Sequence, residues 1–476
     1  MAEKKLPSLT LSAQKKLGIQ QAQSINSIGL MSDIVLQLVG IRGSQAELGT
    51  LFKNPGDYLE GPGKDDERVH ESVRALLNSL AIPSRFGGTP EVYRPFHSAL
   101  VNSSAASKNF RGIGSTVVGG LLGGRASDVA KKVGEVLANW EHHQVASIFR
   151  PFCTAETEPS PEDKSFLREI RNTGGTHVSN WIEKYCAQDW DVWTSVAKGL
   201  SIEEQMDSMA MLAGLHLHRL LQIQLEDSLN AGILCFDPDI VNTAPSTSIY
   251  AYYRHRVPVF LRRVAEGEVD RISQQHPELA SYELEVTRNR WCAQVFFESR
   301  SKKESENFRG KFETTLNREV ATWMSSRGNT VPITREAAKF AIINAYISTT
   351  KNLDKKIVSY FRDTGTIADI VGPATARHKR HLMTPKLLSL LASLHVSRST
   401  TQIETQESEH RSLPAFFDDL RVRYGILISR SQLRPSGLGW ESRVPPSLDD
   451  NAALVSNALE RMGQLRRYSD HSAILV

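Results

Sequence analysis

A chain of 476 residues, of which 40% are hydrophobic and 23% charged, is long enough to form two or three domains with a large core. Its formal net charge of +4 is too small for a protein that is coated in nucleic acid over its whole surface. The four cysteines lack CxxC spacing, which favours a reducing compartment and argues against a disulfide framework or a Cys-rich zinc site.

Residues 1–30 are polar and weakly patterned, which predicts a flexible N-terminal arm or a loosely docked helix. This stretch contains no apolar run of the kind that a signal peptide has. No stretch of the chain approaches the roughly 18 to 20 apolar residues that a membrane-spanning helix needs. We therefore expect a cytoplasmic protein without membrane contact.

Residues 31–235 are predicted to form an N-terminal helical domain around one central, buried helix within residues 201–230. Ser201 and Glu204 have the spacing of a capping box, which marks the start of a helix. Leucine and methionine then recur on nearly all sides, as in a helix at the centre of a large protein. His216 and His218 are two positions apart and should point to opposite sides of this helix.

The glycine-rich stretch at residues 110–124 leads into a predicted helix start. The backbone N–H groups of such a start can hold a phosphate. However, Arg125 stands where the Walker pattern requires lysine, and no strand precedes the stretch as in dinucleotide-binding folds. A flexible loop or close helix packing is therefore favoured over a ligand site.

Residues 248–370 are predicted to form a second helical domain whose first part is basic and aromatic. Arginines interleaved with aromatic residues such as Tyr253 and Trp291 are what phosphate contact and base stacking require. Glu266 and Asp270 dilute the positive charge, so a solvated helix face is the alternative interpretation. The candidate nucleic-acid-binding residues of this domain are Arg254, Arg256, Arg262 and Arg263.

Residues 363–366 spell the DTGT of aspartic proteases. A predicted helix leads into them and the chain has no second copy, so we interpret them as a helix that ends at Gly365. The sequence contains no HExxH or GxSxG motif. We predict no metal site and no cofactor.

Residues 382–476 are predicted to form a small C-terminal winged-helix-like α/β module of short helices with one or two short strands. A basic linker at residues 374–381 precedes this module. Further candidates for contact with a nucleic-acid backbone are Arg377, Lys379 and Arg380. The chain as a whole is expected to be mainly α, with two helical units and this end module.

Arg466 and His471 match the RxxxxH spacing of HEPN-type ribonucleases, which are all-helical and hold this pair on a helix. Ser469 and Asp470 lie between the two residues and favour the end of a helix there. If the protein is nevertheless an enzyme of this kind, Arg466 and His471 are its catalytic candidates.

The segment FFDDLRVRYGILI at residues 416–428, followed by a loop and a helix ending in ALERMGQLRRYSD, resembles one group of defence proteins. These are the helical accessory (non-ATPase) proteins of bacterial anti-phage defence operons of the phosphorothioation-dependent or methylation-associated type. The resemblance covers this C-terminal block only. It implies protein partners, such as an ATPase or helicase subunit, in a DNA-acting complex, and it assigns no catalytic residue.

These patterns predict a non-enzymatic helical adaptor or accessory subunit of a multi-protein, DNA-linked bacterial complex. Two alternatives remain open. One is a HEPN-like ribonuclease, and the other is a self-assembling helical scaffold that makes no contact with nucleic acid.

Overall fold

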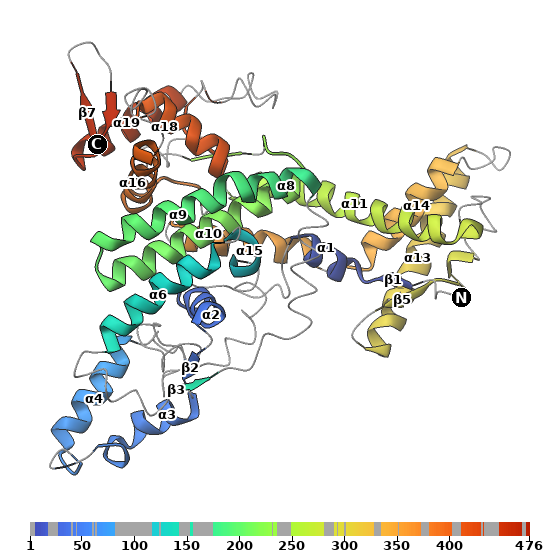
Figure 1. Cartoon of the computed structure of the whole chain (residues 1–476). Helices are drawn as coiled ribbons and strands as arrows, with labels where there is room; N and C mark the ends of the chain where they lie inside the picture. The colour runs from blue at the N-terminus through green and yellow to red at the C-terminus, as the bar shows by residue number, and fades with distance from the viewer. Residues whose placement is uncertain are drawn as a thin grey trace. The chain divides into compact units, whose positions relative to one another are not determined.

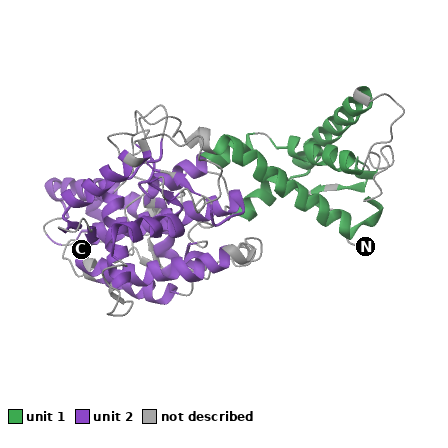
Figure 2. Cartoon of the chain, turned by 90° about the horizontal axis from the view of Figure 1, so that it is seen from above, with its two compact units in different colours: residues 1–17, 252–358 green, residues 18–251, 359–476 purple. Residues whose placement is uncertain are grey.

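The computed structural model shows a mainly α-helical chain, as the sequence predicted (Figure 1). The chain folds into two compact units (Figure 2). Unit 1 combines residues 1–17 with 252–358, and unit 2 combines residues 18–251 with 359–476. The residues that the structure describes are 5–17, 27–39, 41–43, 45–59, 61, 64–80, 117–122, 125–141, 153–155, 175–230, 232–235, 249–279, 290–292, 294–298, 301–327, 335–350, 352–372, 380–401, 411–429, 432, 447–468 and 473–476.

Over its described residues, unit 1 is built from long helices and a pair of very short strands. Its elements are β1 (Lys5–Pro7), α1 (Leu9–Leu17), α11 (Ile249–Gln275, from residue 252), η8 (Pro277–Leu279), β5 (Phe296–Glu298), α13 (Lys302–Arg327), α14 (Arg335–Ser348) and the first residues of α15 (Leu353–Ile367).

The N-terminal segment is an integral part of unit 1. Strand β1 pairs in parallel with β5, and Leu6 and Leu9 are fully buried. Tyr346 on α14 donates a hydrogen bond of 2.6 Å from its hydroxyl to the carbonyl oxygen of Pro7, and Ser12 donates one of 3.0 Å to Glu268 on α11. Of the two expectations for this segment, the flexible arm is corrected for residues 5–17 and a docked helix is present as α1, because these residues contribute apolar side chains to a core formed with distant residues.

Helices α13 and α14 pack against one another in antiparallel directions. The hydroxyl of Ser348 lies 2.8 Å from that of Thr315, and the amide of Asn344 lies 3.3 Å from the carboxylate of Glu319. Residues later in α14 therefore contact residues earlier in α13, so the two helices run in opposite directions. The predicted inward residues of α14, Ala338, Ile342, Ala345 and Tyr346, are all buried.

In the residues that the structure describes, unit 2 is a larger helical body that also contains small strand pairs. Its elements are α2 (Ser27–Val39), β2 (Ile41–Gly43), α3 (Gln45–Lys53), η1 (Pro55–Asp57), α4 (Glu67–Leu80), η4 (Val117–Leu121), α6 (Ala126–Glu141), β3 (Cys153–Ala155), α8 (Gly175–Trp181), η6 (Ile182–Cys186), α9 (Ala187–Val196), η7 (Ala197–Gly199), α10 (Ile202–Glu226), β4 (Ile233–Leu234), the rest of α15, α16 (Pro385–Thr401), α18 (Leu413–Asp419), η9 (Leu420–Tyr424), β6 (Ile426–Leu427), α19 (Ser447–Arg461), β7 (Leu465–Arg467) and β8 (Ala473–Leu475).

Helix α10 is the centre of unit 2, and its prediction is confirmed. Both hydrogen bonds of the capping box form, since the Ser201 hydroxyl accepts from the Glu204 N–H and the Glu204 carboxylate accepts from the Ser201 N–H. Every residue from 208 to 225 is buried. Helix α2, helix α8 and segment η9 contact α10 directly, so elements from both ends of the unit share it as their core (Figure 1).

The C-terminal residues belong to the same compact unit as α10. Strands β7 and β8 form an antiparallel pair that begins with Leu465 opposite Leu475, and β6 pairs in parallel with β4. The short helices and the small two-stranded antiparallel sheet that the sequence predicted near the C-terminus are present, and residues 359–476 group with residues 18–251 in one compact unit. The reason is that the apolar faces of α16 and α18 pack on elements next to α10.

The DTGT residues 363–366 lie inside α15, which corrects the predicted helix stop at Gly365. Helix α15 continues to Ile367, and the positive φ that turns the chain occurs at Asp369. Gly365 is buried, and a side chain there would collide with Val371 and approach His218. Close helix packing therefore explains this glycine.

Among the described residues, no helix has both the length and the apolar character that crossing a membrane requires.

Candidate nucleic-acid interface

The first half of α11 carries positive charge without any negative charge. Residues 252–265 contain four arginines and one histidine but no aspartate or glutamate. Arg254 and His255 are exposed, and Arg256 and Arg263 are half-buried. All four predicted arginines of this domain therefore lie on one helix and reach its surface. A helix of this kind attracts phosphate groups.

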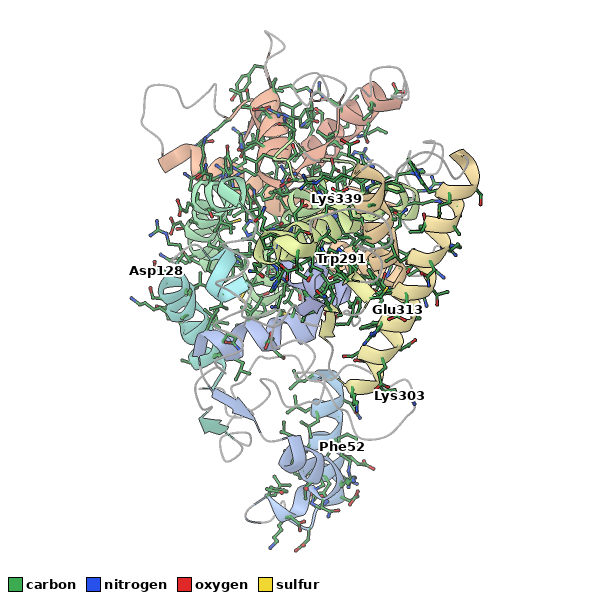
Figure 3. All side chains as sticks on the ribbon, turned by 90° about the vertical axis from the view of Figure 1, so that its right-hand side faces the viewer. Phe52, Asp128, Trp291, Lys303, Glu313 and Lys339 are labelled. Atoms are coloured by element: carbon green, nitrogen blue, oxygen red, sulfur yellow. The ribbon has the colours of Figure 1, made fainter. Side chains whose placement is uncertain are left out.

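The acidic residues of α11 are confined to its second half, and each of them pairs with a cation. Glu266 pairs with Arg262 at 3.0 Å, Asp270 with Lys339 at 2.6 Å, and Glu268 with Arg271 at 2.9 Å. Lys339 comes from α14 (Figure 3). The negative charges of α11 that were expected to dilute its positive charge therefore lie in its second half, and the first half contains no carboxylate.

Helical geometry decides which arginines share a face. With about 100° between successive residues, Arg256 and Arg263 lie within roughly 20° of one another and about 10 Å apart along the axis. Arg262 lies about 80° from Arg254 around the axis, and Arg254 lies on nearly the opposite side of the helix from Arg256 and Arg263. Arg256 and Arg263 therefore form one row that can contact successive phosphates of one backbone, while Arg254 and Arg262 extend the positive charge to other sides of the helix.

The aromatic residues of the predicted stacking surface are placed differently. Tyr253 and Trp291 are fully buried, and the Trp291 indole N–H donates to the carbonyl oxygen of Leu279 at 3.2 Å. These two residues form the core of unit 1 and are not available to a base. The side chain of Tyr252 lies outside the described residues.

An exposed aromatic residue lies instead on α14. Phe340 is 44% exposed, and the guanidinium carbon of Arg262 lies 4.6 Å from its ring centroid, in the range of a cation–π contact. Sequence reasoning missed Phe340. The sequence does contain a signal for it. Phe340 is two residues from both Ala338 and Ile342, which point inward, so it lies on the opposite side of the helix from them.

The linker candidates come from the residue range of unit 2. Arg377 and Lys379 fall outside the described residues. Arg380 is half-buried, its carbonyl oxygen accepts a hydrogen bond from the Gly372 N–H at 2.9 Å, and the next residue, His381, is 2% exposed. The predicted exposed linker is therefore corrected at its end, because Arg380 accepts from Gly372 and His381 forms a β-bridge with Val371, shortly after α15.

Charge is divided unequally between the two units. Unit 1 holds 23 lysines and arginines against 14 aspartates and glutamates, which gives a formal charge of +9. Unit 2 holds 34 against 39, which gives −5. The small net charge of the whole chain is thus the sum of a strongly basic unit 1 and a mildly acidic unit 2. Residues 252–275 of α11 belong to the basic unit.

The catalytic candidates are not supported as a helical pair. Arg466 lies on strand β7 and is exposed, whereas the HEPN arrangement needs this arginine on a helix. His471 falls outside the described residues.

The glycine-rich stretch is described from residue 117 to 122. Within it, Val117, Leu121 and Leu122 are buried, and segment η4 contacts both α10 and α2. Close helix packing is the role shown for that part of the stretch.

A second polar cluster lies deep inside unit 2. Asp189 on α9 is fully buried and accepts hydrogen bonds from His216 at 3.0 Å, Arg398 at 2.7 Å and Arg423 at 3.1 Å. Asp419 completes the group, since it accepts from Arg398 at 2.5 Å and from Arg423 at 2.7 Å. We call these five residues, with His395 bound to Asp419 at 2.9 Å, the buried ion network.

The charges of the buried ion network balance one another. Burial alone would raise the pKa of Asp189, but the charge of Arg398, the hydrogen bond with His216 and the charge of Arg423 together hold it below its ordinary value. Burial is likewise outweighed at Asp419, whose pKa is lowered by its bond with His395 and by the two guanidinium groups. Because Asp189 and His216 are closed off from solvent, we interpret this network as a device that holds helical segments together, not as a site that meets substrate.

His216 and His218 point to opposite sides of α10, as predicted. His216 binds Asp189 and packs edge-on against Trp181 and Trp190. On the other side, His218 lies 3.1 Å from the hydroxyl of Thr364 and edge-on to the ring of His381. Burial lowers the pKa of His218 to about 3 and takes the pKa of His381 well below its ordinary value.

Unit 2 should consequently lose stability in mild acid. Unfolded His218 has a pKa near 6.5 and binds a proton as the pH falls, whereas the folded side chain stays neutral until about pH 3. Between pH 7 and pH 5 this difference lowers the free energy of unfolding by about 2 kcal/mol, and His381 adds to it in the same direction. Urea unfolding, followed by tryptophan fluorescence, should show a smaller pH dependence in His218→Gln. An unchanged dependence would contradict a neutral buried His218.

Among the described residues, no three histidine, cysteine, aspartate or glutamate side chains converge in a way that would hold a metal ion. The sequence matches no protein-family model. No curated protein is significantly similar to it.

Proposed function

We propose that the protein is a non-enzymatic helical accessory subunit of a multi-protein, DNA-linked assembly, and that unit 1 contacts the nucleic-acid backbone through α11. The observation that carries this proposal is the concentration of charge, since unit 1 has a formal charge of +9 and residues 252–265 contain no carboxylate. The C-terminal resemblance at residues 416–470 supplies the class of assembly, that of bacterial anti-phage defence operons.

Contact of this kind should be tolerant of sequence and steeply dependent on salt. Each arginine that meets a phosphate releases condensed counterions, so affinity falls as salt rises. Arg254, Arg256 and Arg263 all lie in the half of α11 that contains no acidic residue. Their positive charge is therefore not diluted by carboxylates of the same half-helix.

Reversing the charge of Arg254, Arg256 and Arg263 to glutamate should weaken binding of labelled DNA by roughly 100-fold at about 0.1 M salt and reduce the salt slope by about three. The reason is the loss of three positive charges of α11 that attract phosphates of the backbone. The measurement is fluorescence anisotropy of the full chain at several salt concentrations.

The matched control reverses Lys302, Lys303 and Arg318 on α13, where all three are exposed. Lys303 is labelled on that helix in Figure 3. This variant changes the charge of unit 1 by the same amount but leaves α11 intact, so it should lose much less affinity. Equal losses in the two variants would place the contact elsewhere, and binding by the wild type that ignores salt would refute backbone contact.

A further inference from the structure

We infer that the nucleic acid held by unit 1 is single-stranded and that Phe340 stacks on one of its bases. This inference rests on the proposed function, because it assigns the strandedness of the nucleic acid that α11 contacts. Its starting point is the exposure of Phe340. Among the described residues of unit 1, Tyr253, Trp291, Phe297, Phe312 and Tyr346 belong to the core, whereas Phe340 is exposed on α14.

Arg262 holds the ring of Phe340 in place, and we call these two residues the stacking platform. The guanidinium of Arg262 lies over the ring at 4.6 Å and is itself held by Glu266 at 3.0 Å. A ring that is fixed in this way loses little conformational freedom when a base stacks on it. Aromatic rings and arginine planes are the groups on which proteins stack unpaired bases.

Next to the platform, three residues of α11 form a strip that is partly apolar and partly basic. His255, Val259 and Arg262 follow one another at spacings of four and three residues, so they share one face of the helix. His255 is exposed, and Val259 is 58% exposed, the largest fraction among the exposed large apolar residues that the structure describes. The strip is about 10 Å long, which is comparable with three stacked bases at roughly 3.4 Å each.

The surroundings of the strip favour a nucleic acid over an apolar protein partner. Arg254 and Arg256 adjoin it, and the carboxylate of α11 next to the strip, Glu266, is paired with Arg262. A duplex hides the faces of its bases in its own stack, so an exposed ring beside arginines gains nothing from it. A single strand presents both phosphates to the arginines and base faces to Phe340.

The test measures the anisotropy of fluorescein-labelled oligothymidylate and of a duplex of equal length with the full chain. Wild type should bind the single strand more tightly. Phe340→Ala should lower affinity for oligothymidylate by roughly 5- to 100-fold, as expected for the loss of one stacked base, with duplex affinity and both salt slopes unchanged. Phe340→Tyr should retain the affinity. Met324→Ala removes another exposed apolar side chain of unit 1, on α13, and should have no effect.

The outcomes separate the two proposals. If Phe340→Ala binds oligothymidylate as tightly as wild type, or if wild type prefers the duplex, the stacking inference is overturned while backbone contact through α11 stands. If wild type binds neither probe in a salt-dependent way, the proposed function itself fails. Because Phe340 is exposed, its substitution should leave the fold intact, which far-UV circular dichroism will verify.

Discussion

Replacing Asp189 with asparagine should lower the free energy of unfolding of unit 2 by about 3–5 kcal/mol. The substitution keeps the shape of the side chain but removes the carboxylate that faces Arg398, Arg423 and His216. Two buried guanidinium groups would then share the single charge of Asp419. An uncompensated buried charge is among the most costly defects in a folded protein.

The measurement is urea unfolding followed by the fluorescence of Trp181, Trp190 and Trp193, all of which are buried in unit 2. The control is Asp207→Asn, which breaks a 2.9 Å pair with Lys386 whose two side chains are about half exposed. Such a surface pair contributes less than about 1 kcal/mol. If both substitutions cost equally little, the buried ion network does not hold its segments together.

Substitution of Gly425 by alanine should destabilise unit 2 by about 3 kcal/mol. Gly425 has a φ of 65°, in the left-handed region that disfavours a side chain. A Cβ atom there would also collide with the guanidinium of Arg219 and lie 2.5 Å from the Gln222 side-chain oxygen. Arg219 is fully buried and donates a 2.6 Å hydrogen bond to the carbonyl oxygen of Leu229, so it has little room to move aside.

Gly463 provides the matched comparison for Gly425. Its φ is 73°, but no atom lies within 4 Å of the position that a Cβ would take. Gly463→Ala should therefore cost only the backbone strain of about 1 kcal/mol. The same urea titration measures both variants, and equal losses would show that the collision with Arg219 is relieved without cost.

Local signals in the sequence were sufficient to predict the central helix. The spacing of Ser201 and Glu204 and the apolar side chains that follow depend only on neighbours within a few turns. The close spacing of the tryptophans at 181, 190 and 193 is likewise typical of core packing, and all three are buried. Elements with a strong helical period are predictable because one helix satisfies its own backbone.

The buried ion network was not predictable in the same way. Asp189, Arg398 and Asp419 come from segments that are far apart along the chain, and each is an ordinary charged residue in its own sequence context. Their burial becomes favourable only when all of the partners are present. No local pattern therefore distinguishes Asp189 from an aspartate at the surface.

Contacts between distant parts of the chain also explain why the sequence did not predict the docking of the N-terminal residues or the contact between Phe340 and Arg262. Residues 5–7 pair with residues 296–298, and three-residue strands carry no pattern from which such a partner can be recognised. For Phe340, the sequence shows that the side chain lies away from the inward face of α14. It does not show that Arg262 of another helix lies over the ring.

The central claim, that unit 1 is the nucleic-acid-binding part, is tested most directly by photo-cross-linking. Oligothymidylate that carries 5-iododeoxyuridine would be cross-linked to the full chain, and the modified peptides would be located by mass spectrometry. We expect adducts in residues 252–265 and in α14 near Phe340, and we expect them to decline as salt rises. Adducts found in unit 2 alone, or adducts that salt does not diminish, would contradict the proposed function.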